Sequence, residues 1–414
     1  MSESYPIGGH TALARRWMTL SPFGERHSLV LTFQASSAVE PKLAEAVRRS
    51  EGTLHSVSDR LSFLERASAL RQLAWEEADV VVAHVHTWDV VPALAFAVPG
   101  GPPVLLVNHA DHSFWVGGAI ADLVVDIRDS GAALTKSLRG ARGTVVLPIP
   151  LEDCGASRPD RTAAAGQLPD PSVLGRGPVL LTIGAARKYQ ATARLDFLRA
   201  ARRIVEAVDD SVLIAIGASP ADPPWQRLAE QTGGRVVALG LLSDLAPWHA
   251  AADLFLESFP VGSYTALLEV ALAERAFVRK PILAPPSALP IDRGALAGVE
   301  PPSDADVYIA AAIALIENPD RRASLAENAR RAVLADHCGS GWHARLDAVR
   351  RAIPPGHEVG LAYAPPPMPG PFAEYWASVR AAATTGNAAQ SALELAFEAG
   401  LEPKTDGELR DATL

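Results

Sequence analysis

The strongest constraint on the fold is an alternation that runs through the first 345 residues, in which short β-branched runs follow helical stretches rich in Ala, Leu and Arg. Parallel strands need a crossover connection, usually a helix, and strands buried on both faces read as continuous apolar runs. We therefore expect an α/β fold with parallel sheets covered by helices. The expected strands are Ser28 to Thr32, Val80 to Ala83, Val104 to Asn108, Leu123 to Ile127, Thr144 to Leu147, Val179 to Ile183, Ser211 to Ile216, Val236 to Ala238, Leu254 to Glu257 and Val278 to Leu283.

A break in this alternation divides the chain into two domains. Residues 151–177 carry scattered Pro, Gly, Asp and Ser without an apolar period, which is typical of a linker. The first domain is expected at 1–150, and the second, with a return helix, at 178–353. Both should be doubly wound and Rossmann-like. Such sheets bind ligands beyond the carboxyl ends of their strands, so we expect the functional site in a cleft between the domains.

Two further segments stand apart from the alternation. Residues 354–414 form a Pro-rich segment followed by a helical tail, with short helical stretches at Phe372 to Ala383 and Ala388 to Ala399. We expect the tail to dock on its own body. The alternatives are that it docks on a partner, or that Tyr375 and Trp376 close over the cleft.

At the other end, the glycine turn Gly8-Gly9-His10 leads directly into the helical stretch Thr11 to Leu20, and Ser2 to Ile7 supplies little apolar strand sequence. Either the first strand is very short or the sequence begins late relative to its natural start.

Composition excludes several classes of protein. The formal net charge is −9 and the pI is near 5.7, so we expect no general affinity for nucleic acid. Cys154 and Cys338 have no ligand-like spacing, which predicts neither a disulfide framework nor a Cys-based zinc site and fits a reducing cytoplasm. The most apolar stretch, Val90 to Val107, is interrupted by Pro and Gly, and the N-terminus lacks a secretory signal, so no membrane span is expected.

The first segment that carries chemistry is a strand that ends in Gly184 and leads into a basic pair, in the sequence GPVLLTIGAARKYQ. Arg187 and Lys188 in such a turn are well placed to bind an anionic diphosphate. The alternative is a solvated pair in a turn.

The second segment is ADLFLESFPVGSYTALLEVALAE, in which a strand ends at Glu257 and a helix starts at Ser263, Tyr264 and Thr265. The free N–H groups at the start of that helix form an anion site, and Glu269, one turn further, can accept hydrogen bonds from sugar hydroxyls. The alternative is that Ser263 or Thr265 only caps the helix and Glu269 is solvated.

The third group consists of polar residues that follow two strands of the first domain. Imidazoles and a carboxylate at strand ends suit proton transfer or the binding of sugar hydroxyls. We discount a metal site here because no HExxH arrangement or cysteine accompanies the histidines, and a structural role is the favoured interpretation for His84 and His86. The group comprises His84 and His86 after one strand, and His109, Asp111 and His112 after the other.

In their order along about the first 350 residues, these motifs resemble the GT-B glycosyltransferases, and most closely glycosyltransferase family 4. The resemblance implies two Rossmann-like domains that face a cleft, with a nucleotide sugar held by the second domain and the acceptor mostly by the first. It assigns Arg187, Lys188 and Gly184 to the diphosphate turn, Glu269 to the ribose and Glu257 to the donor sugar. By the same resemblance, Ser263 to Thr265 form the phosphate-binding helix start, His109 reaches the donor sugar, and Gly9 lies beside the phosphates.

The sequence departs from that family in one respect. Glu257 and Glu269 are twelve positions apart, whereas the glutamates of the family usually lie eight apart, and the intervening FPVG is similar to a segment of the O-GlcNAc transferase-related enzymes. The stereochemistry is therefore open. An inverting transfer needs a base, for which Asp111, His109 or His112 is a candidate, whereas a retaining transfer would use His109 as a hydroxyl or carbonyl partner.

The function expected from this resemblance is transfer of a sugar from a nucleotide-diphosphate sugar, with uridine as the expected nucleotide, to a small-molecule or glycan acceptor. No metal and no cofactor are expected, because no DxD lies in a strand-end loop and Asp304-Ala305-Asp306 is expected to cap a helix. The alternatives are a catalytically silent GT-B partner subunit, and a GT-B sugar-nucleotide epimerase or hydrolase.

Overall fold

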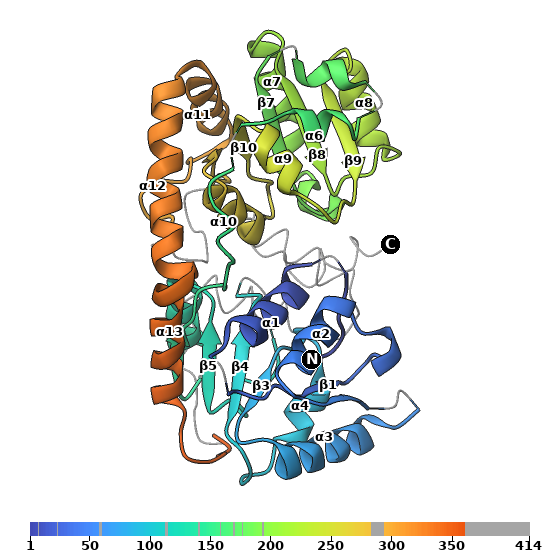
Figure 1. The fold of residues 1–414 in the computed structure, drawn as a ribbon, viewed down its shortest axis with the longest axis vertical. Coiled ribbons are helices and arrows are strands. Elements are labelled where there is room, and N and C mark those ends of the chain that lie inside the picture. The colour runs from blue at the N-terminus through green and yellow to red at the C-terminus, as the bar shows by residue number, and fades with distance from the viewer. Residues whose placement is uncertain are drawn as a thin grey trace, which may run out of the picture.

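The computed structural model describes residues 1–360 apart from 7, 23, 58, 59, 112–114, 140, 158, 169, 176, 193 and 283–293. His112 and the tail beyond residue 360, including Tyr375 and Trp376, lie outside the described residues. The described chain forms two α/β domains, one above the other in Figure 1, and two consecutive helices run along one side of both.

The first domain is built on parallel strands. Every side chain of its strand β4 is buried, as the continuous apolar run predicted. A short parallel pair consists of β1 (Leu29–Leu31) and β2 (Leu54–Ser56), and a sheet contains, in this order, β3 (Val81–Ala83), β4 (Val104–Asn108), β5 (Leu123–Asp126) and β6 (Thr144–Val146). The helices are α1 (Gly9–Leu20), η1 (Ser36–Ala38), α2 (Pro41–Arg49), α3 (Phe63–Glu77), α4 (Val90–Ala95) and α5 (Asp129–Leu138).

The start of the chain packs as a short extended segment beside β1. The backbone N–H of Thr32 donates to Met1 O at 2.9 Å, and that of Phe33 donates to Ser2 O at 3.0 Å. On its other side, the Ser2 hydroxyl accepts a hydrogen bond at 2.9 Å from the backbone N–H of His86, which follows β3. This segment leads into the Gly8-Gly9 turn and α1, and thereby brings the start of α1 to the carboxyl end of the sheet.

The second domain has one parallel sheet in the strand order β11-β10-β7-β8-β9, which is the order of a doubly wound Rossmann sheet. This confirms the predicted fold class. The strands are β7 (Val179–Ile183), β8 (Val212–Ile216), β9 (Val236–Gly240), β10 (Leu254–Leu256) and β11 (Ala276–Val278). The helices are η3 (Ala186–Tyr189), α7 (Phe197–Ala207), α8 (Pro223–Gln231), α9 (Ala246–Ala251), α10 (Tyr264–Leu272) and α11 (Ala305–Glu317).

Two elements differ from the sequence-based prediction. The prediction of a strand at Val278 to Leu283 is wrong, because β11 ends at Val278. Beyond it, the backbone N–H of Lys280 donates to the Glu257 carboxylate at 2.7 Å instead of to a strand, and Pro281 has no N–H to donate. The short strand β2 was missed because three residues with half-buried or exposed side chains carry no apolar pattern.

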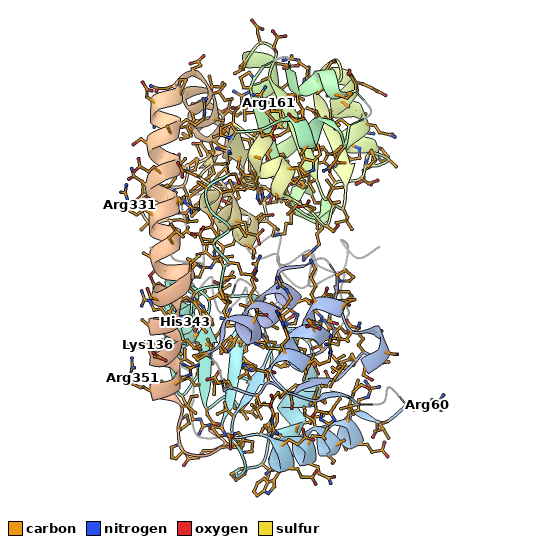
Figure 2. The ribbon with its side chains drawn as sticks, in the orientation of Figure 1. Arg60, Lys136, Arg161, Arg331, His343 and Arg351 are labelled. Carbon is orange, nitrogen blue, oxygen red and sulfur yellow. The ribbon has the colours of Figure 1, made fainter. Side chains whose placement is uncertain are left out.

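The predicted linker follows the surface of the second domain. It contains α6 (Thr162–Ala165) and η2 (Pro171–Gly175). Arg161, labelled in Figure 2, donates to the Asp253 carboxylate at 2.7 Å and to Leu174 O at 2.6 Å. Asp304 caps α11 by accepting from the backbone N–H of Val307 at 2.9 Å, as expected for that DxD.

The chain returns to the first domain through α12 (Pro319–His337) and α13 (Gly339–Ala352), which stand along one edge in Figure 1. On α13, the indole of Trp342 donates to Pro148 O at 2.9 Å, and a ring nitrogen of His343 lies 2.8 Å from Leu20 O. The helix at the end of the predicted second domain thus packs on the first.

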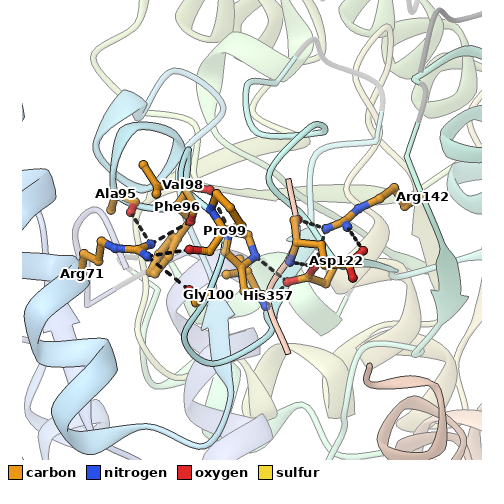
Figure 3. A network of polar contacts seen from close by, with 11 residues as sticks. Arg71, Ala95, Phe96, Val98, Pro99, Gly100, Asp122, Arg142 and His357 are labelled. Atoms are coloured by element: carbon orange, nitrogen blue, oxygen red, sulfur yellow. Dashed lines mark hydrogen bonds and ion pairs between the residues drawn. The ribbon is translucent and has the colours of Figure 1, made fainter. Parts of the chain in front are cut away.

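A strap of residues 353–360 after α13 is fastened to the first domain by buried polar contacts (Figure 3). The ring nitrogens of His357 lie 2.7 Å from the Asp122 carboxylate and 2.8 Å from Phe96 O. Arg142 also pairs with Asp122, and the backbone N–H of Glu358 donates to the same carboxylate at 3.0 Å. Among the described residues, no helix is long and apolar enough to cross a membrane.

Candidate active site

The diphosphate turn predicted from the sequence lies at the carboxyl end of β7. Gly184 follows the strand, and a Cβ there would lie 3.0 Å from both the Ser263 Oγ and the Tyr189 hydroxyl, so glycine permits this close approach. Lys188, in η3, donates from Nζ to Gly262 O at 2.5 Å. Arg187 next to it is exposed. The two predicted donor segments therefore meet at Lys188.

Glu257 lies at the base of the second segment, just beyond β10. Its side chain is buried, and one carboxylate oxygen accepts from the Lys280 backbone N–H at 2.7 Å. Gly262 folds back over the other oxygen so closely that a Cβ would lie 2.6 Å from Glu257 Oε1. The hydroxyl of Tyr308 donates to Glu257 O at 3.0 Å, and burial with this carboxylate nearby raises the pKa of Tyr308 well above its usual value.

The start of α10, predicted as an anion site, has no side-chain cap. The Ser263 side chain does not cap the helix, and its hydroxyl bonds the Ser258 hydroxyl at 3.0 Å instead. The interpretation of Ser263 as a simple cap is thereby excluded. A helix start without a side-chain cap leaves backbone N–H groups of its first turn for an anionic ligand, and the helix dipole favours negative charge there.

The first domain contacts three of the predicted donor residues on α10. A Cβ on Gly9 would lie 3.2 Å from Thr265 Oγ1, so the starts of α1 and α10 face each other across the domain boundary. The guanidinium of Arg128 lies 4.8 Å from the centre of the Tyr264 ring. The third contact is an ion pair at 2.6 Å between Arg16 of α1 and Glu269. These contacts place the second-domain residues at the interface between the domains.

The histidines of the first domain gather at the same interface. The ring of His10 stacks on that of His109, with centroids 4.2 Å apart and planes at 18°. His86 lies 5.2 Å from His10, and its ring stacks on Trp88. His84 is buried deeper and makes an edge contact with Trp17.

Burial favours the neutral form of His84, His10 and His86 by lowering the pKa of each. It lowers the pKa of His84 to about 3, with the N-terminal ammonium group and His109 adding to the effect. Burial also sets the pKa of His10 well below its usual value, and the neighbouring histidines lower it further. For His86 burial lowers the pKa, although the Glu3 carboxylate opposes this shift. Neutral imidazoles can both donate and accept hydrogen bonds, which suits hydroxyl-bearing ligands.

The histidine group is also where a metal ion could be held in the described part of the chain, since ligand nitrogens of His10, His86 and His109 lie within 4.8 Å of one another. A metal ion lies in the plane of each imidazole that binds it. The nearly parallel stack of His10 on His109 cannot direct both rings to one ion without rotation of a ring. Metal-independent transfer stays a prediction.

The carboxylate of Asp111 is engaged in an ion pair, unlike that of a residue free to act as a base. Its side chain is buried, and its carboxylate accepts two hydrogen bonds from Arg128, at 2.5 and 2.7 Å, in a bidentate ion pair. This pair orients the guanidinium that covers Tyr264. The geometry therefore favours a positioning role for Asp111 and leaves His109 as the candidate base within the described residues.

A small pocket, open to solvent, lies beside the histidines. Among its lining residues, the Oδ1 of Asn108 and the indole nitrogen of Trp115 are buried and have no hydrogen-bond partner within the described part of the chain. Unpaired buried polar groups are costly, so they mark places where a ligand can bind. The pocket is lined by Val85, His86, Thr87, Leu106, Val107, Asn108, His109, Ala110, Trp115 and Val116.

The structure thus brings the predicted donor residues of the second domain together with Gly9, His109 and Asp111 of the first. Sequence reasoning missed His10, Arg16 and Arg128 as site residues. His10 had a signal, its place directly after the Gly8-Gly9 turn. Arg16 and Arg128 had none, because nothing in the local sequence shows which side chains cross a domain boundary.

Comparisons with known proteins agree with this geometry. Residues 177–318 match the family model described as glycosyl transferases group 1. No curated protein sequence matches the chain. Anabaena Alr3699/HepE, solved in complex with UDP and glucose, is similar in structure, with a TM-score of 0.60 and 15% identity over 85% of this chain and 97% of that one.

Two further solved structures have a similar fold. WaaG, a glycosyltransferase involved in lipopolysaccharide biosynthesis, has a TM-score of 0.54 and 15% identity over 85% of this chain and 98% of its own. A mutant of the Thermobaculum terrenum O-GlcNAc transferase has a TM-score of 0.52 and 16% identity, covering 84% of this chain and 65% of its own. Both branches of the resemblance seen in the sequence therefore fit. The predicted GT-B fold is confirmed, and residues 177–318, within the second domain, are similar to the group 1 glycosyl transferases.

Proposed function

We propose that this protein transfers a sugar from a uridine-diphosphate sugar to a hydroxyl group of a small-molecule or glycan acceptor, without a metal ion. The observation that carries the proposal is the convergence of Lys188, Glu257 and the uncapped start of α10 at one point of the domain interface. Uridine is supported by Alr3699/HepE, whose structures contain UDP and UDP-glucose. A reducing cytoplasm is the proposed compartment, which suits the exposed free thiol of Cys154.

In this proposal each donor residue acts on one part of the nucleotide sugar. Lys188 and Arg187, with the N–H groups at the start of α10, stabilise the negative charge that develops on the leaving diphosphate. Glu269 accepts hydrogen bonds from the ribose, and the buried Glu257 accepts from the transferred sugar. Preorganised donors in a site shielded from water stabilise such charge more strongly than water does.

The acceptor is proposed to enter from the first domain, through the pocket beside His86, His109 and Trp115. A neutral imidazole can take the acceptor proton as the new bond forms, so His109 is the proposed base of an inverting transfer. The anomeric configuration of the product, read by NMR, tests this step. A retained configuration would assign His109 to the donor sugar instead.

The binding test is a thermal-shift titration with UDP and a panel of UDP-sugars on the wild type and on Lys188→Ala and Glu269→Ala. Arg202→Ala is the matched control, because Arg202 lies on the exposed side of α7 in a pair with Glu206. A donor that binds only the folded state adds about 2.7 kcal/mol at a hundredfold excess over its Kd. Lys188→Ala should lose most of this gain and Arg202→Ala none of it. Equal shifts in all four proteins would show that the donor binds elsewhere.

The same purified protein separates the alternative functions. Release of UDP only when an acceptor is present supports a transferase. Release without an acceptor identifies a hydrolase, and conversion of one UDP-sugar into another identifies an epimerase. Donor binding without turnover over a broad acceptor panel would instead support a silent partner subunit.

A further inference from the structure

Arg16 reaches from the first domain into the donor site of the second. It lies on α1, which begins at Gly9, and its guanidinium Nη2 donates to Glu269 Oε1 at 2.6 Å. The two side chains are 15% and 23% exposed, so the ion pair is shielded from solvent. Shielding strengthens a charge-assisted hydrogen bond relative to one at the surface.

The ion pair with Glu269 leaves some of the hydrogen-bond donors of Arg16 unused. Its Nε and Nη1 are both buried and have no hydrogen-bond partner among the residues that the structure describes. A guanidinium carries five N–H donors in a rigid plane, and buried donors of this kind are normally satisfied. A buried cation with open donors therefore indicates an oxygen-bearing ligand at this point.

A ligand bound to Arg16 at this point would also contact Glu269. One of its carboxylate oxygens bonds to Arg16, and in the described chain the other, Oε2, has no hydrogen bond. A carboxylate held by one oxygen keeps its second oxygen in a fixed direction, ready to accept from a hydroxyl. The ribose of a nucleotide offers two adjacent hydroxyls, each able to donate to the carboxylate and accept from a guanidinium.

We propose that Arg16 and Glu269 together form an interdomain subsite for the ribose of the bound nucleotide, with Arg16 as a positioning residue supplied by the first domain. This inference rests on the proposed function. It has a mechanical consequence, because a ribose held by residues of both domains couples donor binding to the approach of the domains. The contacts of Gly9 with Thr265 and of Arg128 with Tyr264 lie at the same boundary and would respond to the same approach.

The test is calorimetric titration of UDP and of 2′,3′-dideoxy-UDP into the wild type, Arg16→Ala and Arg16→Lys. Arg15→Ala is the matched control, because Arg15 precedes Arg16 on α1 and pairs with the more exposed Glu152 at 3.4 Å. Arg16→Ala should weaken UDP binding about tenfold, Arg16→Lys should restore part of the affinity, and Arg15→Ala should bind as the wild type does.

The dideoxy ligand separates a ribose subsite from a general structural role. The wild type should bind dideoxy-UDP about tenfold more weakly than UDP, whereas Arg16→Ala should bind the two ligands nearly equally. Equal weakening of both ligands by Arg16→Ala, or wild-type affinity for UDP in that variant, would overturn the inference. In either case, loss of UDP binding in Lys188→Ala would leave the proposed donor site standing, whereas unchanged binding in Lys188→Ala and Glu269→Ala would overturn the proposed function itself.

Discussion

The two domains contribute to the site in opposite ways. The second domain builds its part from two segments that are continuous in sequence, with Lys188 bonded to Gly262 and Glu257 fixed by the backbone of Lys280. The first domain assembles its part from side chains on separate segments: His10, His86, His109 and Arg128. Burial lowers the pKa of His10 and His86 and so favours their neutral form, whereas the second domain offers the cation Lys188 and a helix start.

The two domains also differ in whether they match a family model. A diphosphate is the same in every nucleotide sugar, so backbone turns and one helix start can bind it. The match to the group 1 glycosyltransferases covers residues 177–318 and hence only the second domain. Acceptors vary, and side chains from separate loops can change independently.

The largest expected effect comes from crowding the backbone turn of the second domain. In Gly262→Ala the new Cβ would lie 2.6 Å from Glu257 Oε1 and 2.9 Å from Lys280 Cδ, so Glu257 must move. We expect kcat/KM to fall about 100-fold, which corresponds to about 2.7 kcal/mol of transition-state stabilisation. Gly298→Ala, where a Cβ meets nothing within 4 Å, is the control. Equal activity of the two variants would mean that Glu257 is not part of the site.

The second-largest expected effect is on the pH dependence of the unfolding free energy, through the buried His84. His84 has a pKa of about 3 in the folded state, below its ordinary value of 6.5, so acid protonates the unfolded state first. Its contribution to stability is present above pH 6.5 and is lost as the pH falls toward 3. Between pH 7.5 and 5 the wild type should lose about 2 kcal/mol more than His84→Gln. Urea unfolding followed by circular dichroism measures the unfolding free energy at each pH. Parallel profiles of that free energy against pH in the wild type and His84→Gln would contradict the prediction.

A smaller effect on the pH dependence of stability, opposite in direction to that of His84, is expected from Asp126 at the end of β5. Burial raises its pKa from 3.8 to about 6, although hydrogen bonds from Thr144, Asn108 and Thr135 oppose the shift. The folded state therefore holds this proton more tightly, and the stabilisation present below pH 3.8 is lost as the pH rises through 6. From pH 5 to 7 the wild type should lose about 1 kcal/mol relative to Asp126→Asn. A variant that tracks the wild type over this range would show that Asp126 is ionised throughout.

The smallest effect tests the boundary between the two domains. In Gly9→Ala the new Cβ would lie 3.2 Å from Thr265 Oγ1, which a shift of a few tenths of an ångström relieves. Since so small a shift is enough, we expect the Kd of UDP to rise only about two- to threefold in calorimetric titration. A loss as large as that in Gly262→Ala would show that the boundary is as rigid as the turn inside the second domain.

Much of this molecule was predictable from its sequence, for an identifiable reason. The buried strands β4, β7 and β8 are continuous apolar runs, and their burial requires helices on both faces. The donor residues follow strand ends directly, so that a local turn is enough to place them. The strand predicted at Val278 to Leu283 was wrong because the Glu257 carboxylate takes the Lys280 backbone N–H.

The sequence alone therefore determined the doubly wound fold and the local turns in which Gly184, Lys188 and Glu257 follow strand ends, because both depend on hydrophobic period and on neighbours along the chain. Only the tertiary structure decided that Arg16 meets Glu269, that Asp111 is paired with Arg128, and that His10 stacks on His109. These contacts join residues between 17 and 253 positions apart in the sequence. The lowered pKa of His10 likewise follows from burial, which is a property of the packed molecule and not of any one segment.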